Sequence, residues 1–336
     1  AVTESESYVL FVDALRFELA KEFEECLLKT GYKTNLTSAW SAIPTVTPTA
    51  KPDVSPLATE VSDTSKFVEF RPQLCNGKDL QSASFKEALE SLEFTNIKSG
   101  DTLNIEKKYW QEIGDIDRKG HDEQSGIVKR IEELFDYVRE IIDSAFEKGV
   151  KRIKIVTDHG WLLLPGGLPK TQLHDGLTET RWGRCALIKE GVKSELLQLP
   201  WRWNPSVFIA YAPGISFFKA NEEYAHGGIS VQECLLPVLI IENTIESGLS
   251  PKIISSKWVG LKCAVETENS GKDYTLDIRT KFNDETTTIV ISRNKAVIED
   301  KGSLMVSDDA ESQSATIVLL DDKGRIRDKK VTTVGE

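Results

Sequence analysis

Apolar residues along the first 250 positions alternate between short runs and longer stretches with helical spacing. The short runs, each of a length typical of a strand, cover residues 8–12, 154–157, 184–188, 207–211 and 235–241. The longer stretches, at 14–30 and 125–148, place apolar side chains every three or four positions. Helices that alternate with apolar strands predict an α/β fold with a mostly parallel sheet and helices on both of its faces.

The pattern changes after residue 243 to short alternating segments separated by turns. Residues 274–278 and 288–291 alternate between apolar and polar side chains, and turn residues stand between them. This spacing predicts a small antiparallel, sandwich-like β domain. We therefore expect a larger domain of residues 1–247 and a small β domain of residues 248–336.

Two segments of the larger domain interrupt its alternation. Residues 41–57 contain four prolines and several threonines, which predicts a loop. Residues 60–115 have no sustained period. We expect them to form an insertion that covers the functional site.

Composition narrows the class of protein. The chain has 336 residues, 40% of them hydrophobic and 28% charged, which is ordinary for a globular protein. No apolar stretch approaches the length of a membrane span, and residues 1–7 lack the pattern of a secretion signal. The five cysteines are odd in number and none lies in a CxxC spacing, which argues against disulfides and a thiolate zinc site. We expect a soluble protein of the reducing cytoplasm.

The charge of the chain limits its interactions with nucleic acid. The net charge is −11, and about −10 of it lies in residues 1–250. A protein coated for nucleic-acid binding is basic, so any contact with nucleic acid here is local or metal-assisted. The acidity also serves solubility.

Carboxylates and imidazoles stand at positions typical of a metal site. Asp13 and the pair Asp158–His159 each follow an apolar run, and ligands of open α/β sheets bind beyond the carboxyl ends of strands. Asp117 and His121 are four residues apart, so that a helix places both on one face. His226 precedes two glycines. Together these groups suit Zn²⁺, with Mn²⁺ as the alternative.

Each piece alone also has a structural explanation. An aspartate after a strand often caps the next helix, and a DxxxH pair often lies on a solvated helix face. An Asp-His-Gly segment is compatible with a simple turn. Sequence alone does not bring the pieces together in space.

The motifs, taken in order, resemble those of the alkaline phosphatase superfamily. They are Val12-Asp13-Ala14-Leu15-Arg16, Pro44-Thr45-Val46-Thr47, Asp117-Arg118-Lys119-Gly120-His121, Thr157-Asp158-His159-Gly160, and His226-Gly227-Gly228 with Glu233 and Pro237 after it. The sequences around three of these motifs resemble those of the PglZ-domain branch, whose best-known members belong to BREX phage-defence systems. These sequences are VDALR, PTVTP and HGGISVQECLLP. The resemblance covers roughly residues 8–245.

This resemblance implies an alkaline-phosphatase-like fold and a site for two divalent metal ions. One ion would be held by Asp13, Thr47, Asp158 and His159, and the other by Asp117, His121 and His226. The second threonine of the PTxT motif, Thr47, would be the nucleophile, because metal coordination activates a hydroxyl that is weak in water. Thr45 and Thr49 are the competing registers.

The expected function is that of a metal-dependent phosphodiesterase, a nuclease or a nucleotide-ester hydrolase, which works with partner proteins in a phage-defence complex. We expect diesters to be preferred over monoesters. A monoester carries an additional negative charge, and the sequence shows no third cluster of ligands that would neutralise it. Two alternatives stay open: an interaction subunit with a vestigial site, and a phosphomonoesterase or mutase.

A few residues with suitable chemistry remain unassigned. His174 suits either a substrate contact or a structural hydrogen bond, and Arg181 and Arg184, which flank Trp182, suit either a phosphate clamp or surface stacking. Arg16 is expected to form an ion pair or to pack. Trp201 and Trp203 could stack bases, although burial in the core is the commoner fate of tryptophan.

Overall fold

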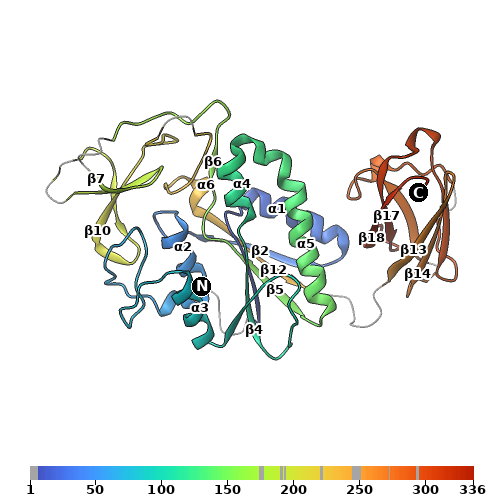
Figure 1. Ribbon diagram of the computed structural model, residues 1–336, viewed down its shortest axis with the longest axis horizontal. Helices are drawn as coiled ribbons and strands as arrows, with labels where there is room; N and C mark the ends of the chain where they lie inside the picture. Colours follow the sequence, from blue (N-terminus) through green and yellow to red (C-terminus); the bar gives the residue numbers. More distant parts are fainter. Residues whose placement is uncertain are drawn as a thin grey trace. The chain divides into compact units, whose positions relative to one another are not determined.

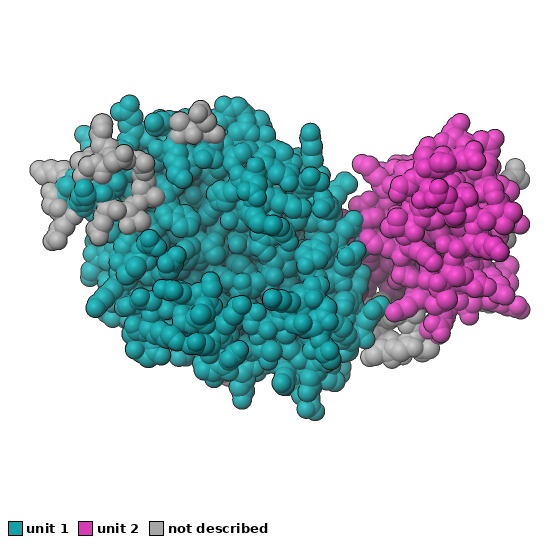
Figure 2. Space-filling view, viewed as in Figure 1, with its two compact units in different colours: residues 1–24, 34–242 teal, residues 25–33, 243–336 magenta. Residues whose placement is uncertain are grey.

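The computed structural model describes residues 7–173, 178–189, 192, 194–219, 222–243, 251–271, 273–292 and 295–336. The chain divides into two compact units, shown in different colours in Figure 2. The first contains residues 1–24 and 34–242, and the second contains residues 25–33 and 243–336.

The first unit is built on a six-stranded sheet with the strand order β2-β12-β5-β1-β4-β3. These strands are β1 (Tyr8–Val12), β2 (Lys33–Trp40), β3 (Phe94–Ile97), β4 (Lys108–Ile113), β5 (Arg152–Val156) and β12 (Leu235–Glu242). β1 pairs in parallel with both β4 and β5, and β3 pairs in parallel with β4. β12 runs antiparallel to β5. The carboxyl ends of β5, β1 and β4 therefore lie side by side at one edge.

Helices cover both faces of this sheet: α1 (Phe17–Thr30) and α5 (Ile131–Glu147) on one face, α2 (Thr47–Val54) and α3 (Ser82–Ser91) on the other (Figure 1). On the first face the rings of Phe23 and Phe135 are 5.0 Å apart. On the second, the ring of Phe85 in α3 is 6.0 Å from that of Trp110 in β4. The predicted α/β class with a mostly parallel sheet is confirmed.

Two of the expected strands belong to a different sheet. β8 (Cys185–Ile188) and β10 (Asn204–Tyr211) pair antiparallel with each other in a separate four-stranded sheet, which is completed by β7 (Thr178–Arg181) and β9 (Gln198–Trp201). Assigning them to the parallel sheet was wrong, because an apolar run indicates a buried strand but not its partner. Two further short strands, β6 (Leu162–Leu163) and β11 (Tyr224–Ala225), also pair antiparallel.

The segment expected as an insertion, residues 60–115, is only partly one. Its later part, residues 94–113, supplies β3 and β4 to the central sheet. The sequence did not predict β4, because Gln111 interrupts its apolar pattern. This polar residue is buried and accepts a hydrogen bond from the Tyr8 hydroxyl.

The proline-rich segment 41–57 is not wholly a loop. Residues 47–54 form α2. Pro48 lies in the first turn of this helix, where a backbone N–H has no helical partner and its loss costs little.

The second unit contains two three-stranded antiparallel sheets. One is formed by β13 (Lys252–Val259), β14 (Lys262–Glu268) and β16 (Lys301–Met305), and the other by β15 (Thr275–Arg279), β17 (Ser314–Leu320) and β18 (Ile326–Thr333). Val265 of one sheet and Ile278 and Ile317 of the other share one apolar core. This is the expected antiparallel β domain, although residues 288–291 make isolated bridges in place of a strand.

Within the described residues, no helix has both the length and the apolar character that crossing a membrane requires.

Candidate metal centre

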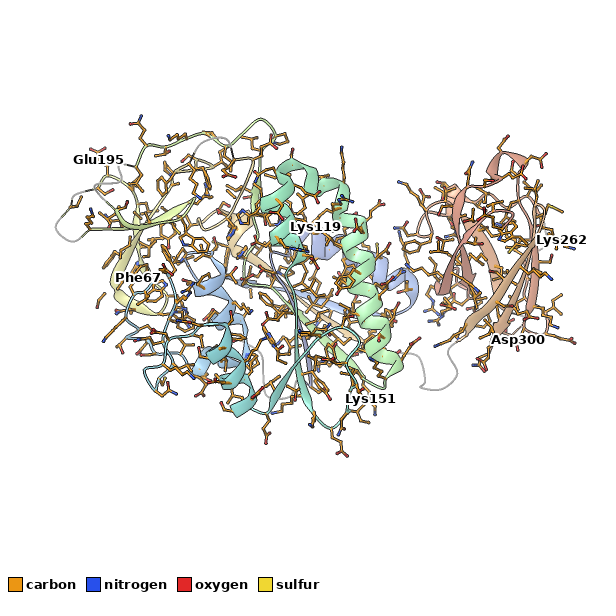
Figure 3. The ribbon with its side chains drawn as sticks, viewed as in Figure 1. Phe67, Lys119, Lys151, Glu195, Lys262 and Asp300 are labelled. Carbon is orange, nitrogen blue, oxygen red and sulfur yellow. The ribbon has the colours of Figure 1, made fainter. Side chains whose placement is uncertain are left out.

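The candidate ligands of the sequence gather at the carboxyl ends of three adjacent parallel strands. Asp13 follows β1 directly, and Asp158 follows β5 after one residue. Asp117 lies in the first turn of α4 (Asp115–Glu123), which begins two residues after the end of β4. Figure 3 labels Lys119, which lies on this helix between Asp117 and His121. Because β5, β1 and β4 are neighbours in the sheet, their ends bring the three carboxylates to one place.

A first group of side chains surrounds His159. The Nε2 atom of His159 is 3.7 Å from Asp13 Oδ1 and 3.8 Å from Asp158 Oδ2. The hydroxyl of Thr47, at the start of α2, is 3.2 Å from the same nitrogen. His159 and Asp158 are fully buried, whereas Asp13 retains some exposure. One imidazole thus meets two carboxylates and a hydroxyl.

A second group contains Asp117, His121 and His226. The Nε2 atoms of the two histidines are 3.1 Å apart. Asp117 Oδ1 is 3.5 Å from His226 Nε2 and 3.6 Å from His121 Nε2. Ligand atoms on a tetrahedral zinc lie about 3.3 Å apart, because zinc–nitrogen and zinc–oxygen bonds are about 2.0–2.1 Å long. The three atoms therefore form a triangle of the size that one face of a zinc coordination shell has.

The two groups adjoin each other. The rings of His159 and His226 stack with 4.0 Å between their centroids. Ligand atoms of Asp117, His159 and His226 also lie within 4.8 Å of one another. All seven candidate residues are thus brought into a single cluster.

Backbone carbonyls fix the orientation of the two buried imidazoles. His159 Nδ1 is 3.1 Å from the carbonyl oxygen of Gly160, and His226 Nδ1 is 2.9 Å from that of Thr45. A carbonyl only accepts hydrogen bonds, so Nδ1 of each ring is the donor and carries the proton. In the neutral form of each ring, Nε2 then presents its lone pair to the cluster, as in metal-binding histidines.

Burial and mutual repulsion govern the ionisation of the cluster. Burial, together with nearby Asp158 and Asp117, raises the pKa of Asp13 well above its usual value. Burial also acts to raise the pKa of Asp117, but the imidazoles of His226, His159 and His121 outweigh it and lower that pKa. Burial, reinforced by His159, lowers the pKa of His226 to about 3. His226 is therefore neutral at physiological pH and free to donate its lone pair.

A divalent metal fits these donors. Asp13 Oδ1 and Asp158 Oδ2 are buried, and neither makes a hydrogen bond within the described part of the chain. Leaving such oxygens unpaired is costly unless a cation compensates them. The Nε2 atoms of His121 and His226 are 3.1 Å apart, a separation that either a shared proton or a cation between them accounts for. The chemistry of the donor set, carboxylates with imidazoles, suits zinc.

The loops that carry the ligands leave little room for larger residues. Ala14, directly after Asp13, has φ of 62°, a left-handed conformation that turns the chain sharply at the end of β1. Gly227 has φ of 105°, and a Cβ on Gly228 would lie 2.6 Å from Glu233. A Cβ on Gly160 would lie 2.0 Å from the carbonyl oxygen of Gln232. The close approach explains the glycines that follow His159 and His226.

Of the three threonines in the PTVTPT segment, Thr47 is the one whose hydroxyl faces the cluster. Thr45 is fully buried and its hydroxyl donates to the Gly228 carbonyl at 2.8 Å. Thr49 is fully buried too and donates to the carbonyl of Phe70, also at 2.8 Å. The geometry supports the register that places Thr47 in the site.

Other residues raised by the sequence have different positions. Arg184 is fully buried and donates to both carboxylate oxygens of Glu233, so it does not face a substrate. Arg16 pairs with Glu18 and stacks over Trp161, as expected of a packing residue. His174 and the side chain of Arg181 lie outside the described residues. Trp201 and Trp203 are buried in the core.

The sequence did not indicate Tyr224, whose hydroxyl donates to Asp117 Oδ1 at 3.0 Å. Its only signal is its position two residues before His226. An aromatic residue at such a place is more often simply part of the core.

Comparisons with known proteins give distant structural similarities. No protein-family model and no curated protein sequence matches the chain. Solved structures that resemble it include murine ectonucleotide pyrophosphatase/phosphodiesterase 5 (TM-score 0.46, 10% identity, 70% of this chain and 88% of that chain) and its human counterpart (0.47, 11%, 71% and 88%). Phosphonoacetate hydrolase from Sinorhizobium meliloti 1021 in complex with phosphonoacetate is a third (0.44, 10%, 70% and 89%). Similarity at this level does not assign the chain to a family.

Proposed function

We propose that the protein is a metal-dependent phosphodiesterase of the alkaline phosphatase superfamily, with Thr47 as its nucleophile. The observation that carries the proposal is the convergence of six ligand-type side chains and one hydroxyl at the carboxyl edge of the sheet. The Thr47 hydroxyl stands 3.2 Å from His159 Nε2 in this cluster. A decayed site loses some of its members, whereas all seven are present here.

The residues divide into two ligand sets. Asp13, Asp158 and His159, with Thr47, would hold one ion, and Asp117, His121 and His226 the other. When bound, two divalent ions neutralise charge on a phosphoryl group and activate a hydroxyl nucleophile. Zinc suits the donors best, and manganese is the alternative.

The protein groups around Thr47 prepare it for attack. The Thr47 hydroxyl oxygen lies 3.2 Å from His159 Nε2, close to the separation of about 3.3 Å between two ligand atoms on one zinc ion. The contact therefore places the oxygen in the cluster, where it and Nε2 would both be ligands of the same ion. Since Thr47 opens α2, its backbone is held by the helix that follows.

The charge of the site supports a diester substrate. Two divalent ions on three carboxylates leave one net positive charge, which matches the single charge of a phosphodiester. Lys51, one helical turn after Thr47, is paired with Glu112 at 2.6 Å and adds no further net charge. A monoester dianion would stay partly uncompensated.

We expect the wild-type protein to cleave bis-p-nitrophenyl phosphate with a higher kcat/KM than p-nitrophenyl phosphate. A difference of about tenfold corresponds to about 1.4 kcal/mol of charge compensation. Steady-state kinetics on both esters, in zinc and in manganese, measures the ratio. A preference for the monoester in both metals would instead make the protein a phosphomonoesterase.

Metal content gives the direct check on the site. We expect two equivalents of zinc per chain by elemental analysis, and loss of one equivalent in Asp117→Ala or Asp158→Ala. Asp115→Ala is the matched control, because Asp115 shares the first turn of α4 with Asp117 but pairs with Arg118. Chelation should abolish turnover, and added zinc should restore it.

A wild-type chain that binds no zinc, manganese or magnesium would leave the scaffold alternative as the function. The resemblance of the motif sequences to PglZ domains supports a role in a phage-defence complex with partner proteins. It also supports a nuclease or nucleotide-ester hydrolase activity. None of the five cysteines, all of which lie in the described part of the chain, forms a disulfide, which supports a cytoplasmic location.

A further inference from the structure

Tyr224 connects the three members of the second ligand group. It lies in β11 and is fully buried. Its hydroxyl donates to Asp117 Oδ1 at 3.0 Å, and this is the oxygen that faces both His121 and His226. A carboxylate oxygen has two lone pairs, so one can accept from the phenol while the other points at a metal.

The ring of Tyr224 also fixes the helix that carries two of these ligands. A Cβ placed on Gly120 would lie only 2.3 Å from the ring, so α4 lies directly against it. The ring meets that of His121 edge-on, with 5.1 Å between centroids. It also contacts the rings of Trp161, at 5.0 Å, and His226, at 6.4 Å.

The backbone of Tyr224 is tied to the far end of the same helix. Gln124, which follows α4 directly, accepts hydrogen bonds from the backbone N–H groups of Glu223 and Tyr224 at 2.8 and 3.0 Å. Pairing of Tyr224 with Leu163 of β6 holds the strand. Tyr224 therefore contacts the first turn of α4 through Asp117 and the end of this helix through Gln124. His226 follows Tyr224 by two residues.

The phenol of Tyr224 is the donor in its contact with Asp117 Oδ1, because an ionised carboxylate only accepts hydrogen bonds. Within the described residues, the hydroxyl of Tyr224 makes no hydrogen bond to Asp13, Asp158 or Thr47.

We propose that Tyr224 is a positioning residue for one metal only, the ion held by Asp117, His121 and His226. This inference rests on the proposed metal-dependent function. The hydroxyl sets the orientation of the Asp117 carboxylate, and the ring sets the distance of α4 from His226. Partners of this kind typically change metal affinity by about 10–100-fold.

The test compares Tyr224→Phe with Tyr211→Phe. Tyr211 is also buried, and its hydroxyl has no hydrogen-bond partner within the described residues, so it controls for loss of a buried phenol. We expect Tyr224→Phe to weaken one of two zinc equivalents by about 10–100-fold and to leave the other unchanged. Tyr211→Phe should bind both equivalents like wild type. Competition titration against a chromophoric chelator measures both affinities.

Cobalt gives a readout that a merely structural role would not change. In the cobalt-substituted protein, the visible absorption of one site should shift in Tyr224→Phe, and that of the other should stay as in wild type. The thermal transition of the metal-free variant should match that of metal-free wild type, because the ring and its packing remain.

Gly120→Ala provides a second variant, independent of the hydroxyl. Alanine has a higher helix propensity than glycine, yet its Cβ would push α4 away from the Tyr224 ring. We expect the same zinc equivalent to be weakened, despite the better helix propensity. Equal weakening of both equivalents, or none, in the two variants would overturn the inference. Absence of metal from wild type would instead overturn the proposed function.

Discussion

Thr47→Ala should lose phosphodiesterase turnover by a factor of about 10⁴ or more while it keeps its fold and both metals. The Thr47 hydroxyl is the nucleophile of the proposed reaction and stands at the cluster, 3.2 Å from His159 Nε2. No other described hydroxyl in the PTVTPT segment faces the cluster. Kinetics on bis-p-nitrophenyl phosphate, with zinc content measured on the same sample, gives the result. Thr47→Ser, which retains a hydroxyl, should keep much of the rate.

The neighbouring threonines are the matched controls. Thr45→Ala removes a buried hydroxyl that donates to the Gly228 carbonyl and accepts from the Gly227 N–H. Thr49→Ala leaves the Phe70 carbonyl and the Trp201 indole without their partner. Each should cost about 1–3 kcal/mol of stability, the penalty of unpaired buried groups, and leave Thr47 in place.

Two outcomes would contradict the assignment. If Thr47→Ala kept wild-type rates while a folded Thr45→Ala were inactive, the register would be wrong by two residues. If both variants were as active as wild type, water would be the nucleophile. The measured metal content separates either outcome from a simple loss of zinc.

Sequence is informative about this site because its ligands follow strands. An apolar run that ends at Asp13 or Asp158 marks the end of a buried strand, and parallel strands share the edge at which they end. The four-residue spacing of Asp117 and His121 is informative for a similar reason, because residues four apart in a helix lie on the same face. These local rules place side chains without any knowledge of the partner strands.

The pairing of strands is not local, and here the sequence was a poor guide. β8 and β10 have the apolar runs of core strands, yet they pair antiparallel outside the central sheet. β4 looked irregular because Gln111 interrupts its apolar pattern, although a hydrogen bond from Tyr8 satisfies this buried amide. Hydrophobicity reports burial, and it does not report which neighbour provides it.

The supporting contacts of the site were the least predictable part. Tyr224 is 107 residues from Asp117 in sequence, and Arg184 is 49 residues from Glu233. Neither pair has a spacing rule that could connect it. Arg184 in particular carries a side chain typical of phosphate binding, and only its burial reveals that it holds a loop instead.

Arg184→Met should destabilise the first unit by about 3–5 kcal/mol, because it leaves the carboxylate of Glu233 buried without its countercharge. Arg184 Nε and Nη2 lie 2.8 and 3.1 Å from the two Glu233 oxygens, and its Nη1 and Nη2 donate to the carbonyls of Ser216 and Gly214. Both side chains are fully buried. Urea unfolding of metal-free protein, followed by tryptophan fluorescence, measures the effect.

The same substitution should weaken metal binding by His226. Glu233 accepts the backbone N–H of Gly228 at 2.8 Å and that of Ser230 at 3.1 Å, so the ion pair fixes the loop that follows His226. With the carboxylate unpaired, this loop loses its anchor. We expect the zinc equivalent of the second ligand group to be weakened more than that of the first, by the competition titration used for Tyr224.

The double variant Arg184→Met/Glu233→Met separates the ion pair from the space it fills. A buried pair replaced as a whole by apolar side chains is often neutral for stability, so the double variant should unfold at a higher urea concentration than Arg184→Met alone. A phosphate clamp predicts the opposite result for the single variant: a raised KM for the diester with stability within about 0.5 kcal/mol of wild type. Because Arg184 is fully buried and its donors are engaged by Glu233 and two carbonyls, we expect the loss of stability and not the clamp behaviour.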